Sequence, residues 1–314
     1  MGKIAFVFSG QGAQYTKMGY ELYERIPESK EVFDLADKTL GFSVSKLCFE
    51  GEDELNKTEN TQIAVLTVSM AALVAIEKAG IKGSISAGLS LGEYSSLIYS
   101  KALAIEDGFR LVRARGEIMS KEVPQGVGAM SAILGLSEDK VLESCTYGSQ
   151  VGIVEAANFN CPGQVVIGGE KAAVTLAGEK ALELGARKVI SLTVSGPFHT
   201  SMLKGAADKL ELELLKVKFS TPVTPYITNV TGDYVTDAIC IPSLLKSQVM
   251  TAVLWEKTIR RMVEDGVDTF VELGPGRVLS GFIKKIDRKL ITLNVEDIKS
   301  LENTIEVLGG ESIC

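Results

Sequence analysis

The chain has 314 residues, 46% of them hydrophobic and 23% charged, and its 33 basic and 40 acidic side chains give a net charge of −7. This acidic balance argues against nucleic acid as a partner. A single histidine, His199, excludes metal sites that need two or more imidazoles, and five cysteines without a CxxC pair exclude a zinc ribbon. We therefore expect a protein of the cytoplasm with reduced cysteines, no metal and no cofactor.

Hydrophobic periodicity predicts strands that alternate with helices over residues 4–121. The strands are expected at 4–9 and 84–88, and the helices at 18–40, 61–79, 93–100 and 105–121. Within the second of these helices, the longest apolar run covers the 14 residues 63–76. That run is too short to cross a membrane and predicts a buried helix in a protein without a membrane partner.

The next segment has an order of its own. Its strands are predicted at 129–136, 152–159, 164–168 and 188–194, and its helices at 137–145 and 171–185. The order β-α-β-β-α-β is the ferredoxin-like pattern. We interpret residues 127–196 as a small subdomain inserted into a larger α/β core that comprises 1–126 and 197–314.

The remainder again alternates helices and strands. Helices are predicted at 200–216, at 255–265 and after Gly274-Pro275-Gly276, and strands at 226–230 and 269–273. Strands that alternate with helices favour a mainly parallel sheet. The fold class predicted for the whole chain is therefore α/β.

A serine between two glycines carries the sharpest chemical signal. Gly88-Leu89-Ser90-Leu91-Gly92 is a GxSxG sequence between a predicted strand and a predicted helix. The glycines allow a tight turn that presents a strained serine hydroxyl, and backbone N–H groups at the helix start can bind an oxyanion. The alternative is a glycine-rich turn with an incidental serine, since GxSxG often arises by chance.

A serine nucleophile needs a base, and His199 is the only imidazole in the chain. It follows Gly196-Pro197-Phe198 just before a predicted helix, whose start favours the neutral, proton-accepting ring. The alternative is a histidine with a structural role. No acidic residue lies in 187–197, so a backbone carbonyl or an amide such as Gln248 could orient the ring.

Arg115 occupies the third unusual position. On a helical wheel of 105–121 it falls on the apolar face, opposite Arg110 and Arg113. A buried guanidinium requires a partner, and a substrate carboxylate would suit its two-pronged donors. An internal ion pair with an Asp or Glu is an equally good alternative.

One basic group could contact a partner protein. Lys284, Lys285, Arg288 and Lys289 lie close together in the last part of the chain. A solvated helix face is the simpler interpretation, and a docking patch for an acidic partner is the other.

Taken in order, these motifs resemble those of the malonyl-CoA:acyl carrier protein transacylases, from about residue 4 to residue 286. The matching positions are GQGAQ at 10–14, GLSLGE at 88–93, Arg115, the segment 158–164, Phe198-His199, Asn229, Gln248 and ELGPG at 272–276. The resemblance implies a hydrolase-like α/β core with a ferredoxin-like insertion. Leu89 departs from the family, which usually has histidine there, so the packing behind the nucleophile is expected to differ.

The resemblance also implies a role for individual residues. The implied catalytic residues are Ser90 as nucleophile, His199 as base and acid, Gln248 as the orienting main-chain carbonyl, and Gln11 and Leu91 as oxyanion-hole N–H groups. The implied substrate-binding residues are Arg115, facing the malonyl carboxylate, and Phe198, Asn158 and Asn160. In related acyltransferases, Leu after the serine and Phe before the histidine look like malonyl-selecting choices, and Leu91 and Phe198 match them.

The function so implied is transfer of malonyl from malonyl-CoA to the phosphopantetheine thiol of acyl carrier protein, through a malonyl-serine, for fatty-acid synthesis. The acidic carrier protein would dock near Lys284, Lys285 and Arg288. Three alternatives stay open: a trans-acting polyketide acyltransferase, a serine thioesterase or hydrolase, and a binding module without chemistry.

Overall fold

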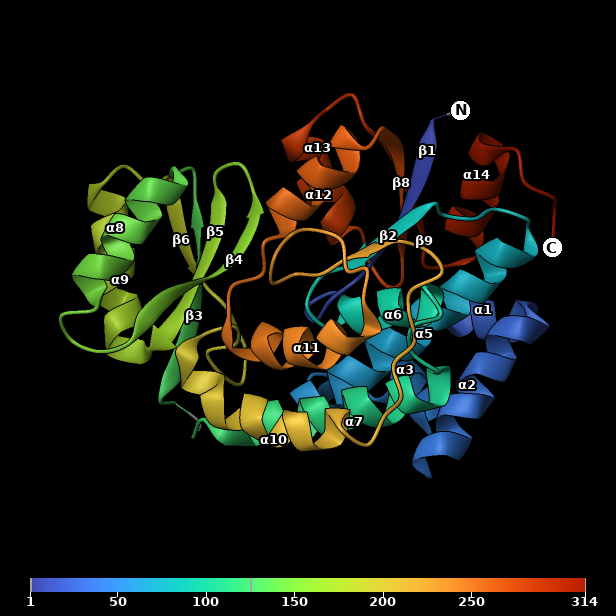
Figure 1. The fold of residues 1–314 in the computed structure, drawn as a ribbon, viewed down its shortest axis with the longest axis horizontal. Coiled ribbons are helices and arrows are strands. Elements are labelled where there is room, and N and C mark those ends of the chain that lie inside the picture. The colour runs from blue at the N-terminus through green and yellow to red at the C-terminus, as the bar shows by residue number, and fades with distance from the viewer. Residues whose placement is uncertain (1, 125, 314) are drawn as a thin grey trace.

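A computed structural model describes residues 2–124 and 126–313 and contains two sheets (Figure 1). The larger sheet has five strands in the order β7-β2-β1-β8-β9, and every neighbouring pair is parallel. Its strands are β1 (Lys3–Phe8), β2 (Ile85–Gly88), β7 (Tyr226–Ile227), β8 (Val267–Leu273) and β9 (Ile291–Val295). The predicted α/β class with a mainly parallel sheet is confirmed.

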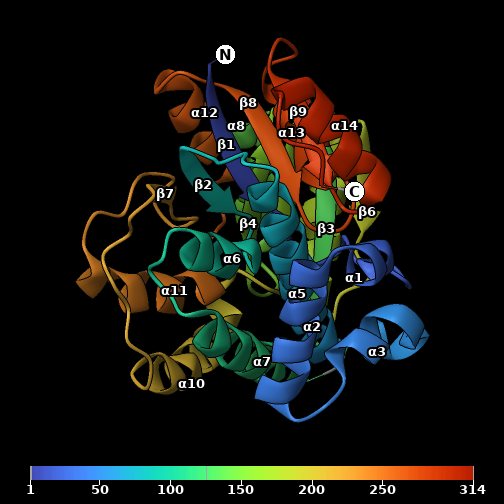
Figure 2. The ribbon, with the colours of Figure 1, turned by 90° about the vertical axis from the view of Figure 1, so that its right-hand side faces the viewer.

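Helices cover both faces of this sheet. Successive side chains of a strand point to opposite faces, and here both faces carry apolar side chains that must be buried. In β1, Phe6 and Phe8 belong to one core cluster, whereas Ala5 and Val7 belong to the other. The first cluster includes residues from α2 (Pro27–Leu40), α5 (Thr58–Lys78), α6 (Gly92–Tyr99), α7 (Ile105–Glu122), α10 (Lys204–Leu214), α11 (Ile241–Met250) and α14 (Ile298–Leu308). The second includes residues from α12 (Trp255–Glu264) and α13 (Val278–Ile286). In Figure 2, α2, α6 and α7 lie below the strands of this sheet.

Helix α5 runs through the first core cluster, as its apolar run predicts. It has 21 residues, more than the predicted run, and by length and apolar composition alone it could cross a membrane. However, 83% of its most apolar window is buried inside the fold. The sequence pattern therefore identifies a buried helix.

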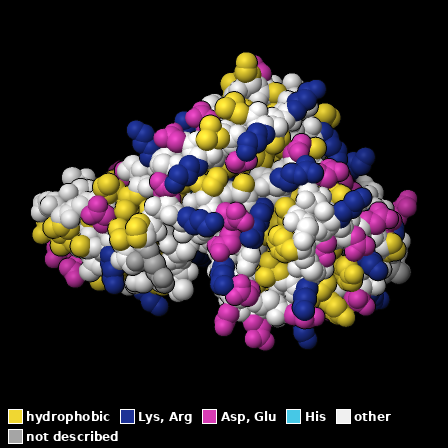
Figure 3. Space-filling model, turned by 90° about the horizontal axis from the view of Figure 1, so that it is seen from below, with side chains coloured by type: hydrophobic (Ala, Val, Ile, Leu, Met, Phe, Trp, Pro, Cys, Tyr) yellow, Lys and Arg dark blue, Asp and Glu magenta, His cyan; other side chains and the backbone are white. Residues whose placement is uncertain are grey.

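The smaller sheet is antiparallel, with the order β4-β5-β3-β6. Its elements follow the predicted β-α-β-β-α-β order: β3 (Gly128–Leu134), α8 (Glu138–Gly148), β4 (Val154–Cys161), β5 (Gln164–Glu170), α9 (Lys171–Glu183) and β6 (Lys188–Ser191). Helices α8 and α9 share a separate core cluster with this sheet. The unit lies at the left of Figure 1, and from below a notch separates it from the larger part of the molecule (Figure 3).

Strand β4 is also tied to the segment that follows α11. Val253 N–H donates to the Ala157 carbonyl at 2.9 Å, and Phe159 N–H donates to the Val253 carbonyl at 2.9 Å. These two bonds form an isolated parallel bridge between Asn158 and Val253. The smaller sheet is thus connected to the larger part of the molecule by backbone hydrogen bonds.

Several boundaries differ from the predicted ones. The helix expected at 18–40 is divided into α1 (Tyr20–Arg25) and α2, because Ile26 is extended and Pro27 cannot continue the helix that precedes it. The strand expected at 226–230 has only the two residues of β7. The elements without a predicted counterpart are α3 (Val44–Glu50), α4 (Glu52–Leu55), α11, β9 and α14.

Candidate active site

The candidate site lies where parallel strands of the larger sheet end. Phe8 of β1 pairs with Gly88 of β2 on one side and with Leu273 of β8 on the other. Parallel strands end at one edge of the sheet, so the loops after β1, β2 and β8 meet there. This register brings the segments of Gln11 and Ser90 together although they are distant in the sequence.

Ser90 occupies the sharp turn between β2 and α6 that the GxSxG sequence predicts. Its φ is 54°, a left-handed conformation that is uncommon for residues other than glycine. A Cβ on Gly88 would lie 1.9 Å from the backbone of Gly92, and one on Gly92 would lie 2.2 Å from the Phe8 carbonyl oxygen. Both glycines are therefore required for the turn to pack against the strands.

His199 approaches Ser90 from another part of the chain, and its backbone also has a positive φ of 62°. Its Nε2 lies 2.8 Å from Ser90 Oγ, and its Nδ1 lies 2.7 Å from the carbonyl oxygen of Gln248. Because a carbonyl can only accept, Nδ1 carries the proton and Nε2 is free to accept one from Ser90. Burial, and next the charge of Arg115, lower the pKa of His199 to about 4. The ring is therefore neutral near pH 7.

Arg115 is only 1% exposed, as the helical wheel predicts. It donates from Nη1 to Gln62 Oε1 at 2.7 Å, and from Nη2 to Ser90 Oγ and to Gln248 Oε1, both at 3.0 Å. Within residues 2–124 and 126–313 it forms no ion pair with a carboxylate. Arg115 therefore has no direct ion pair among these residues, although the charge of Glu93 opposes the lowering of its pKa by burial. The guanidinium contacts the serine hydroxyl.

Two further residues, Asn229 and Gln62, hold Ser90 and Arg115 in place. The sequence analysis assigned no role to either of them. Asn229 Oδ1 accepts the Ser90 N–H at 2.6 Å, and Asn229 Nδ2 donates to the Gly88 carbonyl at 2.7 Å. Gln62, a buried polar residue in the apolar helix α5, holds Arg115. Gln62 directly precedes the apolar run 63–76, so no local sequence signal distinguished it from the other polar residues at the start of the helix.

A cavity of about 220 Å³ opens onto Ser90 and His199. The predicted residues Gln11, Asn158, Asn160 and Phe198 line it, and so does Leu89. Its apolar wall comes from the smaller sheet, the segment after β6 and helices α7 and α13, through Met119, Met130, Val166, Leu192, Val194, Val278, Leu279 and Phe282. Arg115 and Gln248 lie behind the wall and contact the cavity through Ser90.

The two expected oxyanion donors are adjacent to this cavity. Among the hydrogen bonds of the described residues, none uses the backbone N–H of Gln11 or of Leu91. The Gln11 side chain is held separately, by a 3.1 Å bond from its Nε2 to Thr58 Oγ1. Both backbone N–H groups are therefore without a partner in the described residues; Gln11 lines the cavity, and Leu91 directly follows Ser90.

The basic group near the C-terminus begins on α13, the helix whose Val278, Leu279 and Phe282 line the cavity. Lys285 Nζ donates to Gln164 Oε1 at 3.1 Å, and Lys284 Nζ donates to backbone carbonyls beyond the helix.

Comparisons with known proteins show which family the chain is similar to. Residues 5–302 match the acyl transferase domain family. The chain is 44% identical over 314 residues to the malonyl CoA-acyl carrier protein transacylase of Bacillus subtilis, covering 99% of each protein. The crystal structure of the Clostridium perfringens transacylase has a TM-score of 0.95 and 49% identity, covering 98% of this chain and 97% of that one.

A third relative is a malonyl-transacylase solved in complex with a type II polyketide acyl-carrier protein. Its TM-score is 0.94 at 40% identity, with 97% of this chain and 99% of that chain covered. Fold, site geometry and domain match together define an acyl transferase built on a parallel α/β sheet. The chain belongs to the malonyl CoA-acyl carrier protein transacylase family.

Proposed function

We propose that this protein transfers a malonyl group from malonyl-CoA to the phosphopantetheine thiol of acyl carrier protein, through a malonyl-serine on Ser90. The observation that carries the proposal is the position of Arg115. A buried guanidinium without an ion-pair partner in the described chain lies 3.0 Å from a serine hydroxyl that also contacts His199. Such a cation suits an acyl group that ends in a carboxylate.

In the first step, His199 Nε2 takes the proton of Ser90, and Oγ attacks the thioester carbonyl of malonyl-CoA. The tetrahedral oxyanion is stabilised by the backbone N–H groups of Gln11 and Leu91, which are otherwise unused in the described residues. His199 then gives its proton to the CoA sulfur, the carbon–sulfur bond breaks, and malonyl-Ser90 remains.

In the second step, the carrier thiol enters the cavity and loses its proton to His199. The thiolate attacks malonyl-Ser90, the ester bond breaks, and the proton returns to Ser90 Oγ. The Gln248 carbonyl holds Nδ1–H and so keeps Nε2 facing the reacting atoms in both steps.

Selectivity is assigned to the cavity wall. Phe198, beside His199, restricts the space around the substrate α-carbon, and Asn158 and Asn160 offer amides to the polar parts of the substrate. Steric selection of this kind is worth about 1–3 kcal/mol.

The carrier protein is proposed to dock near Lys284, Lys285 and Arg288, since α13 carries both this basic group and part of the cavity wall. We place the enzyme in the cytoplasm and propose residues 127–196 as a subdomain within the core formed by 1–126 and 197–314. A polyketide carrier is a second candidate acceptor, because a solved relative binds one.

Intact-mass measurement tests the proposal. Malonyl-CoA should add one malonyl group to the wild-type enzyme, and phosphopantetheinylated carrier protein should then remove it and gain the same mass. Ser90→Ala should not be malonylated, and malonylation of that variant would overturn the assignment of the nucleophile. Loss of malonyl to water at the same rate with and without carrier protein would instead identify a hydrolase.

A further inference from the structure

Glu93 is a fully buried carboxylate to which the proposed mechanism gives no task. It lies in the first turn of α6, three residues after Ser90. Nowhere in residues 2–124 and 126–313 does it form an ion pair within 4 Å. A buried acid in this position requires a reason, because burial raises the pKa of Glu93, and its hydrogen bonds and the charge of Arg115 offset this effect only in part.

Both of its hydrogen-bond partners belong to the site. Glu93 Oε2 accepts the backbone N–H of Asn229 at 3.0 Å and the Nε2 group of Gln248 at 2.7 Å. These partners come from the loop after β7 and from α11, so one oxygen atom joins two segments to the helix of the nucleophile.

Each partner in turn holds a reacting group. Asn229 binds the Ser90 N–H through Oδ1. Gln248 donates from Nε2 to the Ser90 carbonyl at 2.9 Å, and its main-chain carbonyl binds His199. The relative position of serine and histidine therefore depends on the two residues that Glu93 joins.

The chemistry of Gln248 adds a second effect. Its amide has an accepting end and a donating end, and the two ends are nearly alike in shape. Glu93 Oε2 accepts the NH2 end, which leaves Oε1 for Nη2 of Arg115, a group that can only donate. An amide turned the other way would present donors to the guanidinium, so the accepting atom of Glu93, together with the Ser90 carbonyl that accepts from the same Nε2, sets how Arg115 is held.

We propose that Glu93 is a positioning residue that acts through Asn229 and Gln248 to set both the Ser90–His199 geometry and the orientation of Arg115. The second half of this proposal rests on the proposed malonyl transfer, because it concerns recognition of the malonyl carboxylate. The first half concerns only the reactivity of the serine.

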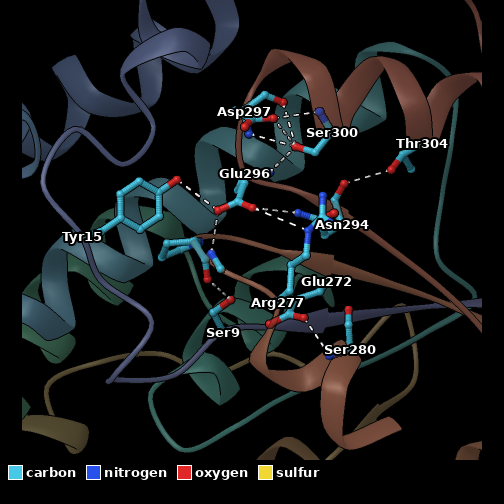
Figure 4. A network of polar contacts seen from close by, with 12 residues as sticks. Ser9, Tyr15, Glu272, Arg277, Ser280, Asn294, Glu296, Asp297, Ser300 and Thr304 are labelled. Carbon is cyan, nitrogen blue, oxygen red and sulfur yellow. Dashed lines mark hydrogen bonds and ion pairs between the residues drawn. The ribbon is translucent and has the colours of Figure 1, made fainter. Parts of the chain in front are cut away.

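The test uses paired substitutions in the full-length enzyme. Glu93→Met removes the accepting oxygen at similar volume, and Glu93→Gln retains one. Glu296 offers a matched control, since its Oε2 likewise accepts a backbone N–H, that of Gly276 at 2.9 Å, and a side-chain donor, the Tyr15 hydroxyl at 3.0 Å (Figure 4). None of the hydrogen bonds of Glu296 involves Ser90, His199 or Arg115.

Two readouts separate positioning from stability. The first is the rate at which a fluorophosphonate labels Ser90, which needs no malonyl group. The second is the preference for malonyl-CoA over acetyl-CoA in formation of the acyl-enzyme. Glu93→Met should slow labelling about 100-fold, the effect of a misplacement of about 1 Å, and should lower the malonyl preference about tenfold.

Glu93→Gln should keep both readouts within about threefold of wild type. Its remaining side-chain oxygen can still accept from Asn229 and Gln248, so the expected loss is smaller than that of one hydrogen bond. Glu296→Met should lower the unfolding temperature and leave both readouts near wild type. If Glu93→Met does not fold, Glu93→Asp, which withdraws the oxygen by one methylene, should slow labelling about tenfold.

A folded Glu93→Met or Glu93→Asp enzyme that labels at the wild-type rate would overturn the proposal, and so would a Glu93→Gln enzyme no better than Glu93→Met. Wild-type enzyme that labels normally but is not malonylated would refute the proposed function instead, and the labelling arm would still decide the role of Glu93.

Discussion

Ser90 and His199 both adopt left-handed backbone conformations, with φ of 54° and 62°, and their Oγ and Nε2 atoms lie 2.8 Å apart. Each strained residue is held by hydrogen bonds from elsewhere in the chain: Asn229 binds the Ser90 N–H, and the Val249 carbonyl accepts the His199 N–H at 3.2 Å. The reacting pair is therefore pre-organised by the surrounding fold.

Acylation should persist to low pH. Because the pKa of His199 is lowered to about 4, the neutral base survives well below the ordinary imidazole value of about 6.5. The kcat/KM for malonyl-CoA should therefore fall only as the pH drops through about 4. Arg115→Met removes one of the charges that lower this pKa, so its acid limb should move to higher pH. A wild-type limb near 6.5 would contradict the buried, neutral ring.

Arg115→Ala should lower kcat/KM for malonyl-CoA by about two to three orders of magnitude, in the range for truncating one partner of a buried charged pair. Acetyl-CoA, which has no carboxylate, should be affected much less. Arg113→Ala is the control on the same helix, because Arg113 pairs with Glu117 at 2.7 Å, away from Ser90. Equal losses for both substrates would mean that Arg115 acts only in packing.

Phe198→Ala should improve the use of methylmalonyl-CoA relative to malonyl-CoA by about tenfold to 100-fold, the range of a hydrophobic pocket that discriminates one methyl group. Phe198 lines the cavity beside His199, so its removal makes room next to the substrate α-carbon. Competition between the two thioesters, followed by mass analysis of the acyl-enzyme, measures the ratio. An unchanged ratio would place selection elsewhere in the wall.

Gly88→Ala should destabilise the protein by several kcal/mol, because its Cβ would lie 1.9 Å from the Gly92 backbone, which cannot shift without deforming the turn. Gly281→Ala makes a sharp contrast. A Cβ there meets no atom within 4 Å in helix α13, so this change should stabilise by about 0.5–1 kcal/mol. Thermal unfolding of both variants gives the comparison, and similar unfolding temperatures would contradict the steric account.

The parts of the fold that sequence could predict are those with a strong local pattern. Helix α5 and the order of elements in the smaller sheet follow from apolar runs bounded by turn residues. Strand β9 and helix α14 were not predicted. Helix α14 does begin with a capping box at Asp297, but a capping box alone does not show what the helix packs against.

Three residues of the site could be predicted from the sequence because each is unusual where it stands. Ser90 lies between two glycines, His199 is the single histidine, and Arg115 falls on an apolar helix face. The hydrogen bonds to them could not be predicted, since Asn229 and Gln62 contact them only after distant segments fold together. Glu93 in turn reaches Asn229 and Gln248 only in the folded chain. The Gln248 carbonyl was named by the family resemblance alone, because every residue has a carbonyl and no local pattern distinguishes the one that contacts His199.

The backbone bridge between Asn158 and Val253 limits how the active-site cleft can open. If the smaller sheet swung outward as a lid, it would break both hydrogen bonds to Val253 or pull on the short segment that leads back to Gln248. Such a movement would disturb the carbonyl that orients His199. The position of the smaller sheet and the alignment of the base are therefore linked through Val253, so we expect the smaller sheet to keep its place when substrates bind.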